Sequence, residues 1–87
     1  MDDILLESLF ENSTDRKICV LIEPWADEFI VEPGDKLDLQ VFGNAWGVLH
    51  TVVEQDHVAI WLWSGSRARV FLNGQDVTAN SITVSVP

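Results

Sequence analysis

The sequence predicts an all-β protein: a small antiparallel β-sandwich, jelly-roll-like in its connections, with one short N-terminal helix. Three observations support this prediction. The chain has 87 residues, the length of one domain with one core. Apolar residues recur with a period of two from Lys17 onward. Turn signals separate the apolar runs at intervals of about ten residues, as in small sandwiches and barrels. We expect one domain over residues 1–87, with the helix at 1–11 and the sandwich at 17–87, or alternatively a five-stranded barrel with added hairpins.

The N-terminal segment has the composition of a short amphipathic helix. Asp2 or Asp3 can cap it, because a carboxylate accepts hydrogen bonds from the first free N–H groups of a helix. Its apolar side chains fall on one broad side of a helical projection: Ile4, Leu5, Leu6, Leu9 and Phe10. A helix this short is not stable alone, so we expect it to pack on the sandwich.

The remaining chain divides into short predicted strands. Residues 36–42 give the clearest one, because Leu37, Leu39 and Val41 alternate with polar side chains. Glu32-Pro33-Gly34-Asp35 and Asn73-Gly74 are the best turn signals, the second of type I′. The other predicted strands are 17–23, 29–31, 48–54, 57–63, 67–72, 75–77 and 81–86, with a loop at 43–47.

The strand predicted at 57–63 is apolar on both faces. One face carries Val58, Ile60 and Leu62, and the other carries His57, Ala59, Trp61 and Trp63. If the first row fills the core, the second needs another cover. That cover is the N-terminal helix, a second copy of the chain, or a different partner.

The strand that follows supplies an interaction surface. Arg67, Arg69 and Phe71 share one face of it, and a hairpin in register would bring them beside the two tryptophans, where arginine stacking is favourable. Arginine and tryptophan are enriched in interface hot spots. The predicted interaction surface is therefore Trp61, Trp63, Arg67, Arg69 and Phe71.

The charge limits the classes of partner. Fourteen acidic residues oppose five basic ones, for a net charge of −9. This argues against binding to nucleic acid or to an anionic membrane, both of which require cations. A basic protein partner fits, and an inhibitor- or immunity-like protein would use the acidic loop residues Asp27, Glu28, Glu32 and Asp35. The acidic N-terminus is unlike a signal peptide, so we expect a cytoplasmic protein.

The stretch EPWADEFIVEPGDKLDL, residues 23–39, resembles small bacterial β-proteins that carry an EPW segment followed by a strand and a Pro-Gly turn. Its PGD turn is also similar to the turn that enters a strand in cupins and cupredoxins. The resemblance implies a cupin- or cupredoxin-like fold. The metal sites of both families are missing, because His50 and His57 are the only histidines and Cys19 precedes both.

Catalytic motifs are also missing: no serine has a nucleophile elbow around it, and residues 43–47 lack the lysine of a phosphate loop. Cys19 lies in an apolar run and is expected to be a buried thiol. We therefore predict a small, acidic, non-enzymatic domain without a cofactor, which acts through contact with a protein partner or as a homodimer. The alternative is a cupin-like small-molecule or metal-binding domain that uses His50, Glu54, Asp56 and His57.

Overall fold

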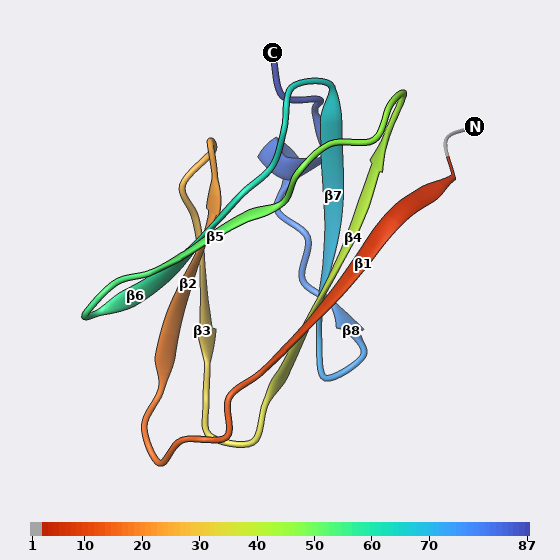
Figure 1. Ribbon diagram of the computed structural model, residues 1–87. Coiled ribbons are helices and arrows are strands. Elements are labelled where there is room, and N and C mark those ends of the chain that lie inside the picture. The colour runs from red at the N-terminus through yellow and green to blue at the C-terminus, as the bar shows by residue number, and fades with distance from the viewer. Residues whose placement is uncertain (1–2) are drawn as a thin grey trace.

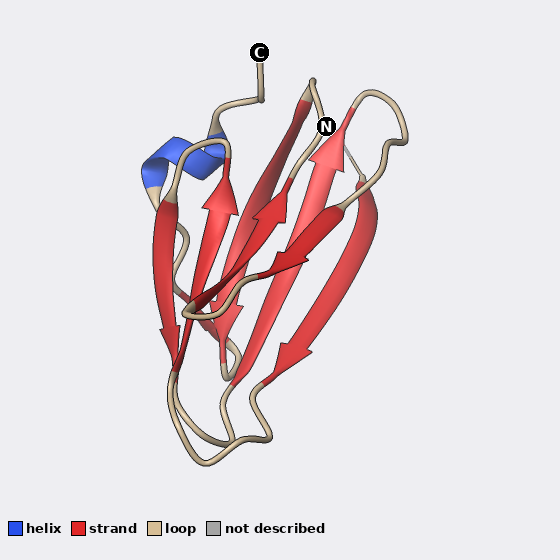
Figure 2. Ribbon diagram, turned by 60° about the vertical axis from the view of Figure 1, so that its left-hand side comes forward, coloured by secondary structure: helices blue, strands red, loops and turns tan. Residues whose placement is uncertain are grey.

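Two four-stranded sheets face each other across one hydrophobic core in the computed structural model, which describes residues 3–87 except the side chains of residues 80 and 81 (Figure 1). The β7 sheet has the order β1-β4-β7-β8 and comprises β1 (Ile4–Glu11), β4 (Lys36–Gly43), β7 (Ser66–Leu72) and β8 (Gln75–Asp76). The β6 sheet has the order β3-β2-β6-β5 and comprises β3 (Asp27–Val31), β2 (Ile18–Glu23), β6 (His57–Trp61) and β5 (His50–Val53). One 3-10 turn, η1 (Asn80–Thr83), follows β8 (Figure 2).

The all-β prediction is confirmed. Neighbouring strands run antiparallel except β2 and β6, which pair in parallel. A parallel pair needs a long connection, and here strands β3, β4 and β5 lie between the two in sequence. In the described residues, no helix has the length and apolar character required to cross a membrane.

The core lies where the apolar rows of the two sheets meet. Leu37, Leu39 and Val41 of β4 are at most 1% exposed, as the alternation predicts. Val58 and Ile60 of β6 face them from the other sheet and are also buried. Burying a side chain of this size stabilises the fold by about 1.5–3 kcal/mol, so these rows fix which face of each strand points inward.

The predicted N-terminal helix is wrong: in the described part of that segment, residues 4–11 form strand β1. Leu6, Ser8 and Phe10 lie opposite Val41, Leu39 and Leu37 of β4, so alternate side chains face the core. The same residues also match a helical projection, and sequence alone does not separate the two patterns. Pairing with the edge of β4 satisfies the main chain of the segment, whereas an isolated helix of this length is unstable.

The strand predicted at 81–86 is also wrong. Residues 80–83 form η1, which places Ile82 in the core at 0% exposure, while Val84 is 65% exposed. The end of the chain lies beside the start of β7, where the Val86 N–H donates to the Ser66 carbonyl at 2.8 Å. Burial of one isoleucine therefore outweighs the period-two pattern of this segment.

The two turn predictions are confirmed. Asn73 and Gly74 have φ of 51° and 83°, as a type I′ turn requires. Gly34 has φ of 86°, and the Asp35 N–H donates to the Glu32 carbonyl at 2.9 Å. The side chain of Asn73 donates to the Asp35 carboxylate at 2.8 Å, which joins the two turns at one end of the molecule.

Candidate functional site

The outer face of the β6 sheet is the first candidate site. Strand register places Cys19 beside both Ile30 and His57, and Leu21 beside Ala59, all pointing away from the core. Val52 and His50 of β5 continue the same face next to Ala59 and Trp61. We call its apolar part the open face, which consists of Cys19, Leu21, Ile30, Val52, Ala59 and Trp61.

The open face is accessible to solvent. Trp61 and Ile30 are each 41% exposed, Cys19, Leu21 and Val52 are half-buried, and Ala59 is buried. The other four described strands belong to the β7 sheet, which packs on the opposite, core-facing side. The predicted N-terminal helix does not cover the row that contains Trp61, because β1 belongs to the other sheet.

The surroundings of the open face are acidic. The four strands of the β6 sheet contain no lysine or arginine. Glu23 and Glu28 project from the same face, next to Trp61 and Leu21 respectively. Oε1 of Glu23 is buried and has no hydrogen-bond partner among the described residues. The rim of the apolar centre is therefore acidic beside Trp61 and Leu21, whereas Arg16 and Lys17 lie near His57 at the other end of the sheet.

Trp63 does not share the face of Trp61, contrary to the prediction. The strand ends at Trp61, and the indole N–H of Trp63 donates to the Ala45 carbonyl at 3.0 Å. A Cβ at Gly47 would overlap the Trp63 ring, so the indole packs tightly on the loop backbone. Trp63 therefore anchors the loop between β4 and β5.

Arg67, Arg69 and Phe71 lie on the other sheet, so the structure does not bring the predicted interaction surface together. β6 and β7 do not pair; the chain crosses from one sheet to the other between them. The Arg67 guanidinium lies 5.6 Å from the centre of the Phe42 ring, and Arg69 lies 5.6 Å from that of Phe71. The arginines thus stack on phenylalanines and not on tryptophans.

The four predicted acidic-loop residues do not form one loop. Asp27 and Glu28 begin β3, whereas Glu32 and Asp35 lie in the turn after its other end. The Asp35 carboxylate accepts hydrogen bonds from the Glu32 N–H and from Asn73, so it stabilises that turn. Of the four, Glu28 projects from the same face as Leu21 of the open face.

Of the four predicted metal ligands, Glu54, Asp56 and His57 lie together at the turn between β5 and β6, and His50 lies apart from them. His50 lies opposite Trp61, at the far end of β6 from His57, a separation of about 13 Å at 3.3 Å per residue. Among residues 3–87, excluding the two undescribed side chains, no three His, Cys, Asp or Glu groups are close enough to hold a metal ion. Asp56 accepts a hydrogen bond from Nδ1 of His57 at 2.7 Å, which lowers the pKa of that carboxyl group.

Cys19 is half-buried on the open face. Burial raises the pKa of its thiol, and the negative charge of the nearby Glu28 carboxylate raises it further. A raised pKa keeps the thiol protonated, and the thiol is the less nucleophilic form. The environment therefore favours a packing role for this side chain.

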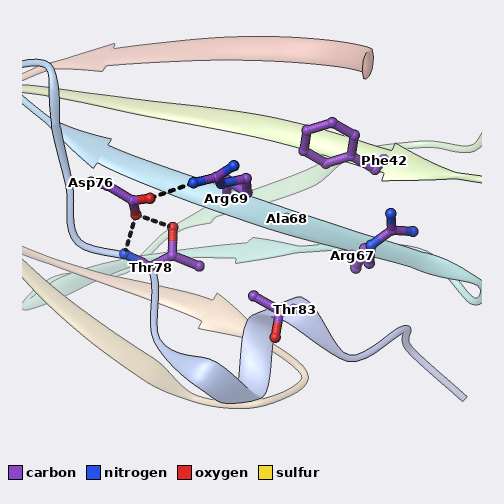
Figure 3. Close-up of a pocket in the computed structure, with 7 residues that line it drawn as sticks. All are labelled: Phe42, Arg67, Ala68, Arg69, Asp76, Thr78 and Thr83. Carbon is purple, nitrogen blue, oxygen red and sulfur yellow. Dashed lines mark hydrogen bonds and ion pairs between the residues drawn. The ribbon is translucent and has the colours of Figure 1, made fainter. Parts of the chain in front are cut away.

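A pocket of about 750 Å³ beside β7 is the second candidate site. Figure 3 shows Arg69 joined to Asp76, whose carboxylate also binds Thr78; the Arg69–Asp76 distance is 2.6 Å. The pocket is lined by Phe42, Arg67, Ala68, Arg69, Asp76, Thr78 and Thr83. The sequence singled out only the arginines, because the other residues reach the pocket through long-range pairing and through η1.

No family model matches this chain, and comparisons with curated proteins and with solved structures return no match. The resemblance to small bacterial β-proteins, cupins and cupredoxins therefore stays a prediction.

Proposed function

We propose that this protein works through protein contact, and that the open face binds a partner with an apolar centre and a basic rim. The observation that carries the proposal is the uncovered apolar row of a sheet that contains no lysine or arginine. A non-enzymatic role, as the sequence predicts, belongs to the same proposal.

The apolar part of the open face supports a protein partner. A contiguous exposed apolar patch costs solubility, and in soluble proteins it commonly marks an interaction site. Trp61 lies at one end of the patch and Ile30 at the other, both with surface left to bury. Tryptophan is enriched among hot-spot residues, where truncation costs about 2 kcal/mol or more.

The charge selects the kind of partner. With a net charge of −9, the protein attracts basic surfaces and repels acidic ones before contact. Glu23 and Glu28 beside the open face would meet lysine or arginine on the rim of the partner. A second copy of the chain would instead bring two surfaces of the same sign together, which disfavours the homodimer.

A jelly-roll, cupin- or cupredoxin-like relationship and a small-molecule role remain the alternative interpretation.

The test compares matched charge variants in a binding assay. Tagged wild-type protein, Glu28→Gln and Glu11→Gln are used to retain proteins from native extract at low and at moderate salt. Both variants lose one negative charge, but Glu11 lies in β1, on the other sheet. We expect Glu28→Gln and Trp61→Ala to lose the retained basic protein, while Glu11→Gln and Trp46→Ala keep it. Salt should weaken retention, because the Debye length falls from about 10 Å at 0.1 M to 3 Å at 1 M.

Two outcomes would contradict the proposal. One is a partner held equally by wild type, Glu28→Gln and Trp61→Ala, which would place the contact elsewhere. The other is recovery of only further copies of this chain, with sedimentation velocity showing a dimer that Trp61→Ala dissociates.

A further inference from the structure

The strands at the edges of the two sheets differ in charge. The edge strands of the β7 sheet are β1 and β8, and those of the β6 sheet are β3 and β5. Strands β1, β3 and β8 each carry at least one Asp or Glu, whereas β5, with the sequence HTVV, is the edge strand in the described chain that carries none. Because charged side chains discourage a further strand from pairing with an edge, β5 is the least protected edge.

The main chain of β5 has hydrogen-bonding groups that the fold leaves unpaired. The Glu54 N–H donates to the carbonyl of His57, the residue opposite it, at 2.8 Å. Because hydrogen-bonded pairs alternate along an antiparallel ladder, Val52 also bonds to β6, whereas the N–H and C=O groups of Thr51 and Val53 point to the free edge. These groups have no hydrogen-bond partner among the described residues. Their spacing fits the main chain of one added strand.

The side chains of β5 leave apolar surface on both sides of this edge. Val53 is 79% exposed, the highest value among the exposed large apolar side chains of the described residues. Val52 is half-buried and lies beside Ala59 on the open face. A strand added next to β5 would cover Val53 with one row of its side chains and would extend the open face past Val52 with the other row. The free edge is therefore continuous with the open face.

We propose that an extended segment of the basic partner adds to the free edge of β5 as a further strand of the β6 sheet. This inference rests on the function proposed above, because it specifies how the partner of the open face binds. Main-chain hydrogen bonds to Thr51 and Val53 hold the segment, and the carboxylate of Glu54, directly after β5, selects lysine or arginine in it. Two copies of this chain, each with a net charge of −9, repel each other, which disfavours pairing of β5 with the same strand of a second copy.

The test is an NMR titration of ¹⁵N-labelled protein with a basic, strand-forming peptide, acetyl-Lys-Val-Lys-Val-Lys-Val-Lys-amide. We expect saturable shifts and slower hydrogen exchange of the Thr51 and Val53 amides, because their N–H groups gain acceptors. The control peptide has proline in place of each valine, so it keeps the lysines but cannot pair as a strand. Thr51→Pro removes an outward N–H and should weaken peptide binding about tenfold, whereas the matched variant Thr51→Ala keeps that N–H and should bind like the wild type.

The proposal is overturned if the lysine–valine peptide leaves the Thr51 and Val53 amides unchanged, if the proline peptide shifts them equally, or if Thr51→Pro binds the peptide as well as Thr51→Ala. Failure of the proposed function is seen separately, in retention of the basic protein by Trp61→Ala. Retention that is lost in Trp61→Ala but kept in Thr51→Pro would support the open face and exclude the edge. Unchanged amide shifts in the β7 sheet establish that each variant is folded.

Discussion

The side-chain amide of Asn12 donates a hydrogen bond of 2.9 Å to the main-chain carbonyl of Val31. Asn12 directly follows β1 in one sheet, and Val31 ends β3 in the other, so this contact joins the two sheets. The same amide donates to the Arg16 carbonyl at 2.8 Å, and the asparagine is 0% exposed. A buried, fully engaged side chain of this kind holds the ends of two strands together.

We predict that Asn12→Ala destabilises the protein by about 2–3 kcal/mol, because it removes the side-chain donor from the buried Val31 carbonyl. Urea unfolding followed by tryptophan fluorescence measures this change. Asn44→Ala, in the exposed loop after β4, is the matched control and should stay within about 0.5 kcal/mol of wild type. Equal stability of the two variants would show that the link between the sheets contributes little.

Two glycines should respond differently to alanine. At Gly34 nothing lies within 4 Å of an added Cβ, so the cost is that of a positive φ, about 1–2 kcal/mol. At Gly47 the added atom would overlap the Trp63 ring, and overpacking costs about 1–3 kcal/mol in addition to displacing the indole. Gly47→Ala should therefore change the fluorescence spectrum of the folded protein, whereas Gly34→Ala should not. A Gly47→Ala spectrum identical to that of wild type would contradict the observed packing.

Structural features that depend on neighbouring residues were predicted from the sequence, and features that depend on residues far apart in the chain were not. The alternation of Leu37, Leu39 and Val41 and the Asn73-Gly74 turn are local signals, and the structure confirms both. Residues 4–11 satisfy two periodicities at once, and only pairing with β4 decides between them. The same holds for Ile82, whose burial depends on a gap between sheets that no local pattern describes.

Asp38 should make the protein less stable as the pH rises. Burial raises the pKa of this carboxyl group, and hydrogen bonding to Glu7 raises it further. Oδ1 of Asp38 is buried without a partner among the described residues. Because the pKa is raised in the folded state, the protonated form favours folding: this contribution is full below the ordinary pKa of 3.8 and is lost as the pH rises through the raised value.

Asp38→Asn removes that ionisation, so we predict a variant more stable than wild type at neutral pH. The difference should shrink as the pH falls below the raised pKa. Denaturant unfolding at a series of pH values measures it, with Asp15→Asn as a control for loss of the same charge at an exposed residue. A constant difference between Asp38→Asn and wild type across the pH series would refute the assignment.

Asp76 should make the protein less stable as the pH falls, which is the opposite of the effect of Asp38. Hydrogen bonds from Thr78, then the contact with Arg69, lower the pKa of Asp76 to about 2. Because the folded-state value is lowered, its stabilising contribution is present above the ordinary pKa of 3.8 and is lost as the pH falls toward about 2. Asp76→Asn should therefore be less stable than wild type at neutral pH, and the two should converge in strong acid.

The Asp76 carboxyl carbon can be followed directly by NMR. We expect it to titrate near pH 2 in wild type and at higher pH in Thr78→Val, which removes the hydroxyl donor. Titration of the wild-type carboxyl at the ordinary value of 3.8 would mean that Thr78 and Arg69 do not hold it as described.

The candidate sites were less predictable than the strands. The sequence identified Trp61, Arg67 and Arg69 as candidate contact residues, but it grouped them on the assumption that consecutive strands form a hairpin. β6 instead pairs with β2 in parallel, which places Trp61 beside Glu23 and leaves the arginines on the other sheet. Which strands pair across long intervals depends on the whole core, so side chains that share a surface are the hardest feature to read from one sequence.

The most direct test of the open face is the solvent exposure of the Trp61 indole with and without the retained basic partner. Paramagnetic relaxation by an inert gadolinium chelate reports it for each indole N–H. In the free protein we expect strong relaxation at Trp61 and weak relaxation at Trp63, whose N–H is bonded to Ala45. Trp46 is exposed in the loop between β4 and β5, away from the open face, so binding should protect Trp61 and leave Trp46 exposed. A Trp61 signal already protected in the free monomer, or still fully relaxed in the complex, would contradict the account.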